Sequence, residues 1–349
     1  MKIAVDAMGG DNAPAINIDG SILALKEFNT GQRVSGENLE LILIGQKELL
    51  KKELALRGVP ALPIEIRAAT QVIGMEETTQ EACRKKPDAS ILVGTMMLKN
   101  GEADAFVSAG NSGAVMAAAV LNLERLKGIR RPAIATVFPT LKEPCVIVDV
   151  GANAECKAKH LFQFAIMGES YVKYVFKRRI PRVALLSMGH EEGKGSVLVQ
   201  SAYKLLMKSN VNFIGNIEGH DIIKGAADVV VCDGFVGNII LKFGESIGVS
   251  LMKLLKQELE KSLLRKAAAG VMKGAFYEVN KMINPEETGG APLLGVNGAC
   301  IICHGGSTVK AMKNAINTAI EYVDQDVNKH IQESILQNST GLLRGALHD

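Results

Sequence analysis

The sequence has little of what several classes of protein require. It contains no tryptophan, aromatic residues make up 4% of it, and 40 basic residues against 37 acidic ones leave a formal net charge of only +3. A nucleic-acid-binding protein needs a basic bias or aromatic stacking platforms, so the sequence predicts no nucleic-acid partner. Six cysteines dispersed over 349 residues are not spaced as a disulfide framework.

Long apolar segments are missing as well. Residues 1–6 lack the apolar core of a signal peptide. Two uncharged stretches, 105–123 and 288–309, carry glycine, asparagine and serine residues that a membrane span rarely tolerates in such number. We therefore expect a cytoplasmic protein with reduced thiols, and its 349 residues allow one large domain or two modest ones.

Short apolar runs, each followed by a turn rich in glycine, asparagine or aspartate and then by a helical pattern, dominate the chain. They predict strands at residues 2–6, 39–44, 105–107, 145–150, 182–186, 228–232 and 299–303. Apolar strands that alternate with helices are typical of an α/β fold in which a parallel-rich sheet is covered on both faces. Because no linker or repeat divides the chain, residues 1–349 are expected to form one compact unit of interlocked lobes.

Residues 247–282 depart from this rhythm. Leucines at helical spacing alternate with lysine and glutamate, and a small-residue turn at 267–270 precedes a return helix, which predicts a protruding amphipathic hairpin. A dimer interface or core packing is the first interpretation, and an apolar tip on a membrane surface is the alternative; both hold if a dimer presents the tip. The expected membrane contacts are Leu263, Leu264, Val271 and Met272.

Five turns that contain glycine follow predicted strands. They are residues 9–12, 108–113, 151–153, 234–238 and 304–307. Ligands of open α/β sheets bind at the carboxyl ends of the strands. Small residues let backbone N–H groups approach a ligand, and a helix N-terminus adds partial positive charge. The five turns together predict an anionic ligand such as phosphate.

Patterns in the chain that resemble nucleotide-binding and haem-binding motifs do not have the residue spacing that those functions require. Residues 189–196 resemble a Walker A loop but are one residue short, and Gly195 separates Lys194 from Ser196, so ATP hydrolysis is not expected. Lys194 is either a point charge for phosphate or a solvated surface lysine. Residues 300–304 spell a haem-attachment string, yet Cys300 and Cys303 would point to opposite faces of a strand, which predicts two buried thiols. No histidine or cysteine spacing predicts a metal site.

At this point the turns become recognisable as a set. The chain closely resembles the bacterial PlsX family in KIAVDAMGGD (2–11), SAGNSGA (108–114), DVGAN (149–153), NFIGNIE (212–218), DVVVCDGFVGN (228–238) and GGAPLLGVNG (289–298). The resemblance runs in order to about residue 319. It implies a three-layer α/β/α, Rossmann-like fold similar to that of isocitrate and isopropylmalate dehydrogenases. It also implies a homodimer, and peripheral association with the inner face of the cell membrane.

The resemblance further implies a reaction. A fatty acyl group passes from acyl carrier protein to inorganic phosphate, and a membrane acyltransferase uses the acyl phosphate for phosphatidic acid synthesis. The phosphopantetheine arrives on the carrier protein, so no further cofactor is expected. Basic residues at 84–86 and 130–131 are candidates for steering the acidic carrier.

Direct attack by phosphate requires a positioned phosphate and hydrogen-bond donors for the oxyanion, without a covalent nucleophile. The expected catalytic residues are Lys194, Asn238 and His304. The expected substrate-binding and phosphate-binding residues are Asp6, Gly9, Gly10, Asn111, Ser112, Gly113, Asn153, Gly237 and Gly305. Family members usually carry Asn-Glu at 196–197 and serine at 306, where this chain has Ser196, Val197 and Gly306, so side-chain roles at 196 and 306 are not transferred.

Three other functions stay open at this stage. A phosphotransacetylase-like enzyme would use coenzyme A thioesters for the same chemistry. An NAD-dependent β-decarboxylating dehydrogenase would need a carboxylate cluster for a divalent metal and an arginine-rich site for a hydroxy acid, and neither stands out in the sequence. A non-catalytic scaffold would recruit lipid enzymes through the hairpin.

Overall fold

The computed structural model describes residues 1–30, 38–58, 62–287 and 289–345. An 11-stranded sheet runs through the molecule in the strand order β3-β2-β1-β4-β11-β10-β5-β6-β9-β7-β8. The strands are β1 (Lys2–Asp6), β2 (Glu40–Gly45), β3 (Ile64–Ala68), β4 (Ala105–Ser108), β5 (Ala133–Phe138), β6 (Cys145–Val148), β7 (Val183–Leu186), β8 (Phe213–Ile217), β9 (Val229–Val231), β10 (Ala291–Leu294) and β11 (Ala299–Ile302). Every strand expected from the sequence is present to within two residues at each end, and the α/β class is confirmed. β3, β5, β8 and β10 were not expected.

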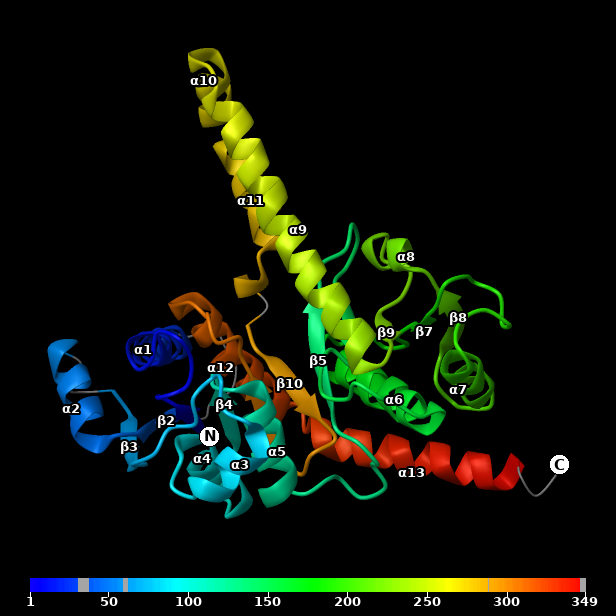
Figure 1. Ribbon diagram of the computed structural model, residues 1–349, viewed down its shortest axis with the longest axis horizontal. Coiled ribbons are helices and arrows are strands. Elements are labelled where there is room, and N and C mark those ends of the chain that lie inside the picture. The colour runs from blue at the N-terminus through cyan, green and yellow to red at the C-terminus, as the bar shows by residue number, and fades with distance from the viewer. Residues whose placement is uncertain (31–37, 59–61, 288, 346–349) are drawn as a thin grey trace.

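Helices cover both faces of the sheet (Figure 1). Side chains alternate along β1, so Ile3 and Val5 enter the core on one face and Ala4 enters the core on the other. Because both faces are buried, the strands are apolar throughout instead of alternating. The first core is covered by α1 (Ala15–Asn29), α2 (Lys47–Leu56), α6 (Ala158–Val175), α7 (Val197–Met207), α12 (Val309–Asp324) and α13 (Val327–Gly345). The second is covered by α3 (Thr79–Lys85), α4 (Ser90–Lys99), α5 (Ser112–Asn122) and α8 (Gly219–Ile223).

Strand direction divides the sheet into two lobes. Lobe one comprises β3, β2, β1, β4 and β11, which are mutually parallel, and lobe two comprises β6, β9, β7 and β8, which are also mutually parallel. Between them, β10 is antiparallel to both β11 and β5, and β5 is antiparallel to β6. The strands of lobe two therefore run opposite to those of lobe one. Consequently the carboxyl ends of the two sets, called here the lobe-one edge and the lobe-two edge, lie at opposite edges of the sheet.

Three helices project from the body of the molecule (Figure 1): α9 (Gly234–Glu260), α10 (Leu263–Val271) and α11 (Lys273–Ile283), after which η1 (Pro285–Glu287) leads back to the sheet. They contain the hairpin expected at 247–282. At its tip the exposed fractions of Leu263, Leu264 and Val271 are 85%, 82% and 89%, and Met272 is half exposed. By length and composition alone α9 would be able to cross a membrane, a test that helices of soluble proteins also pass.

Candidate active site

At the lobe-one edge, a buried carboxylate holds the first glycine turn from beneath. Asp6 ends β1 with no exposed surface. It accepts hydrogen bonds from the Ser108 hydroxyl at 2.7 Å and from the Met8 N–H at 3.1 Å. A Cβ at Gly9 would lie 2.5 Å from Asp6 Oδ2, so only glycine allows this approach. Burial raises the pKa of Asp6, although hydrogen bonds from serine hydroxyls oppose the shift. Asp6 therefore positions the turn from beneath, and its carboxylate has no exposed surface.

The remaining turns of this edge meet the first one. The Asp11 N–H donates to the Gly305 carbonyl at 2.9 Å, and a Cβ at Gly10 would lie 2.9 Å from the same oxygen. His304 is exposed, and its Nδ1 accepts the Gly306 N–H at 3.1 Å. That bond assigns the proton of the neutral ring to Nε2, which makes Nε2 a hydrogen-bond donor. A Cβ at Gly306 would make only an ordinary 3.4 Å contact with His304 Nδ1, so a larger residue fits there.

Asn111 begins the helix that follows β4 at the same edge. Its Oδ1 accepts the Ala114 N–H at 3.0 Å as the cap of α5, and its Nδ2 donates to the Met75 carbonyl at 2.9 Å. Both ends of the amide are thus engaged within the protein. Ser112 is exposed and Gly113 partly exposed beside it, so these residues present backbone to the surface while Asn111 fixes the turn.

At the lobe-two edge, Asp149 performs the same task as Asp6. It follows β6, is fully buried, and accepts the N–H groups of Ile134 at 3.0 Å, Ala152 at 3.1 Å and Asn153 at 2.7 Å. Burial raises the pKa of Asp149, and these bonds oppose the shift. The sequence contains Asp149 in a recognised motif, yet it was not chosen as a site residue because nothing in a single sequence separates a supporting carboxylate from a ligand-binding one.

Asn153 and the start of α9 pack onto this carboxylate. Asn153 Nδ2 donates to Asp149 at 2.9 Å and to the Pro132 carbonyl at 2.7 Å, which leaves Asn153 buried. A Cβ at Gly237 would lie 1.9 Å from the Asp149 carbonyl oxygen, and one at Gly151 would lie 3.8 Å from Asn238 Oδ1. The partly exposed Asn238 therefore stands directly beside the Asp149–Asn153 turn.

Lys194 is exposed in the turn formed by residues 187–196, which follows β7 at the same lobe-two edge. The turn is anchored from below: His190 Nε2 lies 2.8 Å from Asp221 Oδ2, and Asn216 Nδ2 donates to the Glu191 carbonyl at 2.9 Å. Burial alone would raise the pKa of Asp221, but the Glu218 N–H and the neighbouring histidines lower it. Sequence reasoning missed this anchor, because His190 and Asp221 become neighbours only through the parallel pairing of β7 with β8.

The structure therefore divides the expected site residues between the two edges. Those at the lobe-two edge are Lys194, Asn153, Gly237 and Asn238, and those at the lobe-one edge are Asp6, Gly9, Gly10, Asn111, Ser112, Gly113, His304 and Gly305. Because the edges are opposite, the described turns of one chain form two groups, and all five do not surround one anionic ligand within a single chain.

Cys300 and Cys303 lie in the two different cores, as the strand periodicity predicts. Burial raises the pKa of each thiol to about 12. Both thiols are therefore protonated at neutral pH and poor nucleophiles, and they cannot form the paired thiols of a redox motif.

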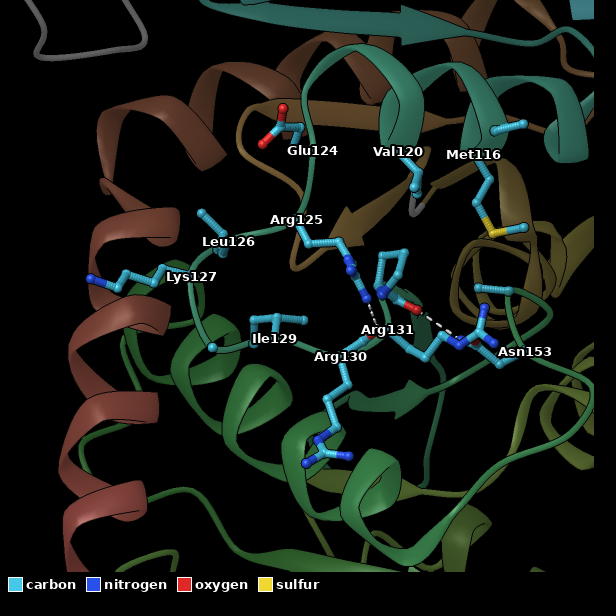
Figure 2. A pocket seen from close by; sticks show the side chains of 14 residues that line it. Met116, Val120, Glu124, Arg125, Leu126, Lys127, Ile129, Arg130, Arg131 and Asn153 are labelled. Atoms are coloured by element: carbon cyan, nitrogen blue, oxygen red, sulfur yellow. Dashed lines mark hydrogen bonds between the residues drawn. The ribbon is translucent and has the colours of Figure 1, made fainter.

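A pocket of about 910 Å³ adjoins the lobe-two edge (Figure 2). Its walls are the second half of α5, the segment 124–132 that leads into β5, and the turn that carries Ala152 and Asn153. Arg125, Lys127, Arg130 and Arg131 all line it. We call it the basic pocket.

Comparisons with known proteins agree with one another over nearly the whole chain. The model of a family described as fatty acid synthesis protein matches residues 1–330. The phosphate acyltransferase of Pelobacter propionicus is 48% identical over 338 residues, which are 97% of this chain and 95% of that protein. The phosphate acyltransferase of Geobacter sulfurreducens is 46% identical over 344 residues, which are 99% of this chain and 97% of that protein.

Solved structures with a similar fold include two phosphotransacetylases. One from Streptococcus pyogenes has a TM-score of 0.60 at 18% identity and covers 93% of this chain and 94% of its own. The EutD phosphotransacetylase from Staphylococcus aureus has a TM-score of 0.57 at 16% identity, with 95% and 94% covered. At these identities the two structures establish a shared fold and nothing more.

Proposed function

The chain belongs to the fatty acid synthesis protein family, the PlsX family of phosphate acyltransferases, and from this premise we propose that its acyl donor is the thioester of a fatty acyl-carrier protein and its acceptor inorganic phosphate. The observation that carries the proposal is the lobe-two edge, where an exposed lysine and a partly exposed asparagine stand on glycine turns. Burial raises the pKa of the two thiols that contact the turn at this edge, Cys156 and Cys232, so neither is a ready nucleophile. The product is an acyl phosphate, which a membrane acyltransferase consumes in phosphatidic acid synthesis.

In the proposed reaction, a phosphate oxygen forms a bond to the thioester carbonyl carbon, and the carbon–sulfur bond then breaks. The departing thiol has an ordinary pKa of about 8.5 and leaves as a thiolate that takes a proton from solvent, so no strong general acid is needed. Lys194 supplies a positive charge to the phosphate or the oxyanion, and Asn238 donates a hydrogen bond. No cofactor beyond the phosphopantetheine of the donor takes part.

Two outcomes decide the chemistry. Purified protein should release free carrier-protein thiol only when inorganic phosphate is present, and Lys194→Ala should lower turnover about a hundredfold, the usual effect of losing one oxyanion donor. Mass spectrometry of a quenched reaction should find no acyl group on the enzyme. Near-normal turnover of Lys194→Ala refutes its role, and a covalent acyl-enzyme refutes direct attack.

We propose that the active form is a homodimer whose sites combine the two edges. A two-fold axis perpendicular to the strands reverses their direction in the partner, so the lobe-one edge of one copy and the lobe-two edge of the other then face the same side. The apolar face of α9, which is exposed in the single chain, supplies a surface for such pairing. His304 of one copy then works with Lys194 and Asn238 of the other.

Mixing two inactive variants tests this arrangement. When Lys194→Ala and His304→Ala chains are denatured together and refolded, about half of the dimers are mixed, and each mixed dimer holds one intact shared site. Activity should return to about a quarter of the wild-type value. If each site lies within one chain, every site in the mixture carries a substitution and no activity returns, which overturns the shared site while leaving the reaction itself untouched.

The hairpin tip is proposed to hold the enzyme peripherally on the inner face of the cell membrane. Each buried leucine side chain contributes about 1.5–3 kcal/mol to partitioning, so Leu263→Gln with Leu264→Gln should weaken vesicle binding at least tenfold. Leu141→Gln is the control, at an equally exposed leucine (81% exposed) in the turn between β5 and β6, where its N–H donates to the Ile223 carbonyl. Equal vesicle binding by both variants argues against the tip as the contact.

A further inference from the structure

The basic pocket holds more positive charge than the protein itself balances. Arg125, Lys127, Arg130 and Arg131 line it together with one acidic residue, Glu124. Among the residues that the structure describes, none of these four cations forms an ion pair. Burial first, and then the charges of Arg131, Arg130 and Lys157, lower the pKa of His160 nearby. His160 thus experiences the positive charge of Arg130 and Arg131, and four cations around one pocket favour an anion in this place.

The segment that carries the cations is held in place from several sides. Leu126 N–H donates to the Gly295 carbonyl at 3.0 Å, and Arg130 N–H donates to Gln163 Oε1 at 2.8 Å. Gln163 Nε2 in turn donates to the Gly128 carbonyl at 2.7 Å. Leu126 and Ile129 are buried beneath the segment. The guanidinium groups therefore stand on a backbone that is already ordered, so little backbone entropy is lost when a ligand binds.

The pocket is amphipathic. Met116, Ala117 and Val120 of α5 form an apolar wall opposite the arginines. In Figure 2, Arg131 extends toward Asn153 and Arg125 points across to the backbone of residue 130, whereas Lys127 extends away on the outer side. A small inorganic ion has no use for an apolar wall or for about 910 Å³ of space. The arrangement fits a phosphate ester that continues into a long, uncharged arm with apolar segments.

The geometry points to the phosphodiester of a phosphopantetheine arm as the ligand of the basic pocket, with Arg131 and Arg125 on the phosphate and the α5 wall along the arm. This inference rests on the proposed function, in which the acyl donor is a thioester of such an arm. Asn153 lines the pocket, and the turn that contains Gly151 and Asn153 lies beside Asn238. An arm anchored here therefore directs its thioester toward the lobe-two edge. Arginine suits the role because its planar guanidinium binds phosphate oxygens in pairs.

Four acyl donors test the inference, and two of them, acyl-phosphopantetheine and acyl-pantetheine, differ only in the phosphate. Steady-state KM is measured for acyl-carrier protein, acyl-coenzyme A, acyl-phosphopantetheine and acyl-pantetheine, which lacks the phosphate. Arg131→Gln should raise KM roughly tenfold for the phosphate-bearing donors, leave the KM of acyl-pantetheine unchanged, and leave the KM of inorganic phosphate unchanged. Arg131→Lys should recover part of the loss. Arg179→Gln, at an exposed arginine before the amino end of β7, removes the same charge at the opposite edge of lobe two and should change nothing.

The outcomes separate the two claims. A KM increase for acyl-phosphopantetheine that is shared with acyl-carrier protein or with acyl-coenzyme A supports the pocket and identifies the source of the arm. An increase confined to acyl-carrier protein, with acyl-phosphopantetheine unchanged, places Arg131 against the carrier protein surface and overturns the assignment. An equal increase for acyl-pantetheine, or an increase confined to the KM of inorganic phosphate, overturns the assignment while the proposed function stands. If the wild-type protein turns over none of these thioesters in the presence of phosphate, the proposed function fails instead.

Discussion

At Gly237, one added methyl group should impair the site strongly while leaving the fold largely intact. A Cβ there would lie 1.9 Å from the Asp149 carbonyl oxygen and 2.9 Å from its carbon, against 3.4 Å or more for an ordinary contact. The clash is with backbone, so no side chain can rotate away. Relief requires the start of α9 and the Asp149 turn to separate by about 1.5 Å, and overpacking of this kind costs about 1–3 kcal/mol.

The same displacement moves Asn238, the next residue along α9. Because a misplacement of about 1 Å at a reacting centre reduces rate about a hundredfold, Gly237→Ala should lower turnover about a hundredfold while the melting temperature falls by only about 5 °C. Turnover of purified, folded variant is measured well below that temperature, and melting is followed by circular dichroism.

Gly274→Ala is the matched control. Gly274 lies in α11, and a Cβ added there would meet no atom within 4 Å apart from its chain neighbours and the nearby backbone of its own helix. Alanine at this position should stabilise the helix by up to about 1 kcal/mol and leave turnover unchanged. If Gly237→Ala retains full turnover and melts like the wild type, the close packing of α9 on the Asp149 turn does not matter for activity, and the reasoning about this edge is refuted.

Two further substitutions test the supports of lobe two. Asp221→Asn removes the charged partner of His190 and should lower turnover about tenfold through a looser 187–196 turn, with little change in melting; an unchanged kcat would show that the anchor is dispensable. Asp228 accepts hydrogen bonds from Arg178 and Arg182, and these outweigh the burial that alone would raise its pKa, so its folded-state pKa is lowered. The contribution of Asp228 to the free energy of unfolding is thus complete above its unfolded pKa of about 3.9. It is lost as the pH falls through the lower folded-state pKa. Asp228→Asn should lower the free energy of unfolding by about 3 kcal/mol at pH 7, measured by urea unfolding. If the difference in unfolding free energy between the wild type and the variant did not shrink in acid, this account would be contradicted.

The strands that sequence patterns predicted are those buried on both faces in parallel sets. The strands they missed lie at the two ends of the sheet or between the lobes. β3 and β8 are the edge strands, and their partly exposed residues interrupt the apolar run on which the prediction depended. β5 and β10 join the lobes by antiparallel pairing. β10 is four residues long and includes Pro292, which removes a backbone donor and ordinarily argues against a central strand.

The missed strands also explain why the arrangement of the site could not be predicted. The rule that ligand turns gather at the carboxyl ends of strands applies within one parallel set. Each of β10 and β5 reverses the direction of the sheet relative to its neighbour, and β6 then begins lobe two in the opposite sense. Turn composition identified the correct type of residue at both edges, but the number of reversals between them depends on pairing, which a single sequence does not show.

The two edges are prepared by the same local device. Asp6 at the end of β1 and Asp149 just after β6 are both fully buried, and each accepts N–H groups from the turn that follows it. A turn fixed from beneath by a carboxylate is ordered before any substrate arrives, so binding need not order it. What one chain cannot do is bring its two edges together, because the pairing of β10 with β5 and β11 fixes their opposite orientation. In the proposed dimer, the two-fold axis reverses the strand direction in the second copy. The lobe-one edge of one copy and the lobe-two edge of the other then combine two rigid sets of donors into one site.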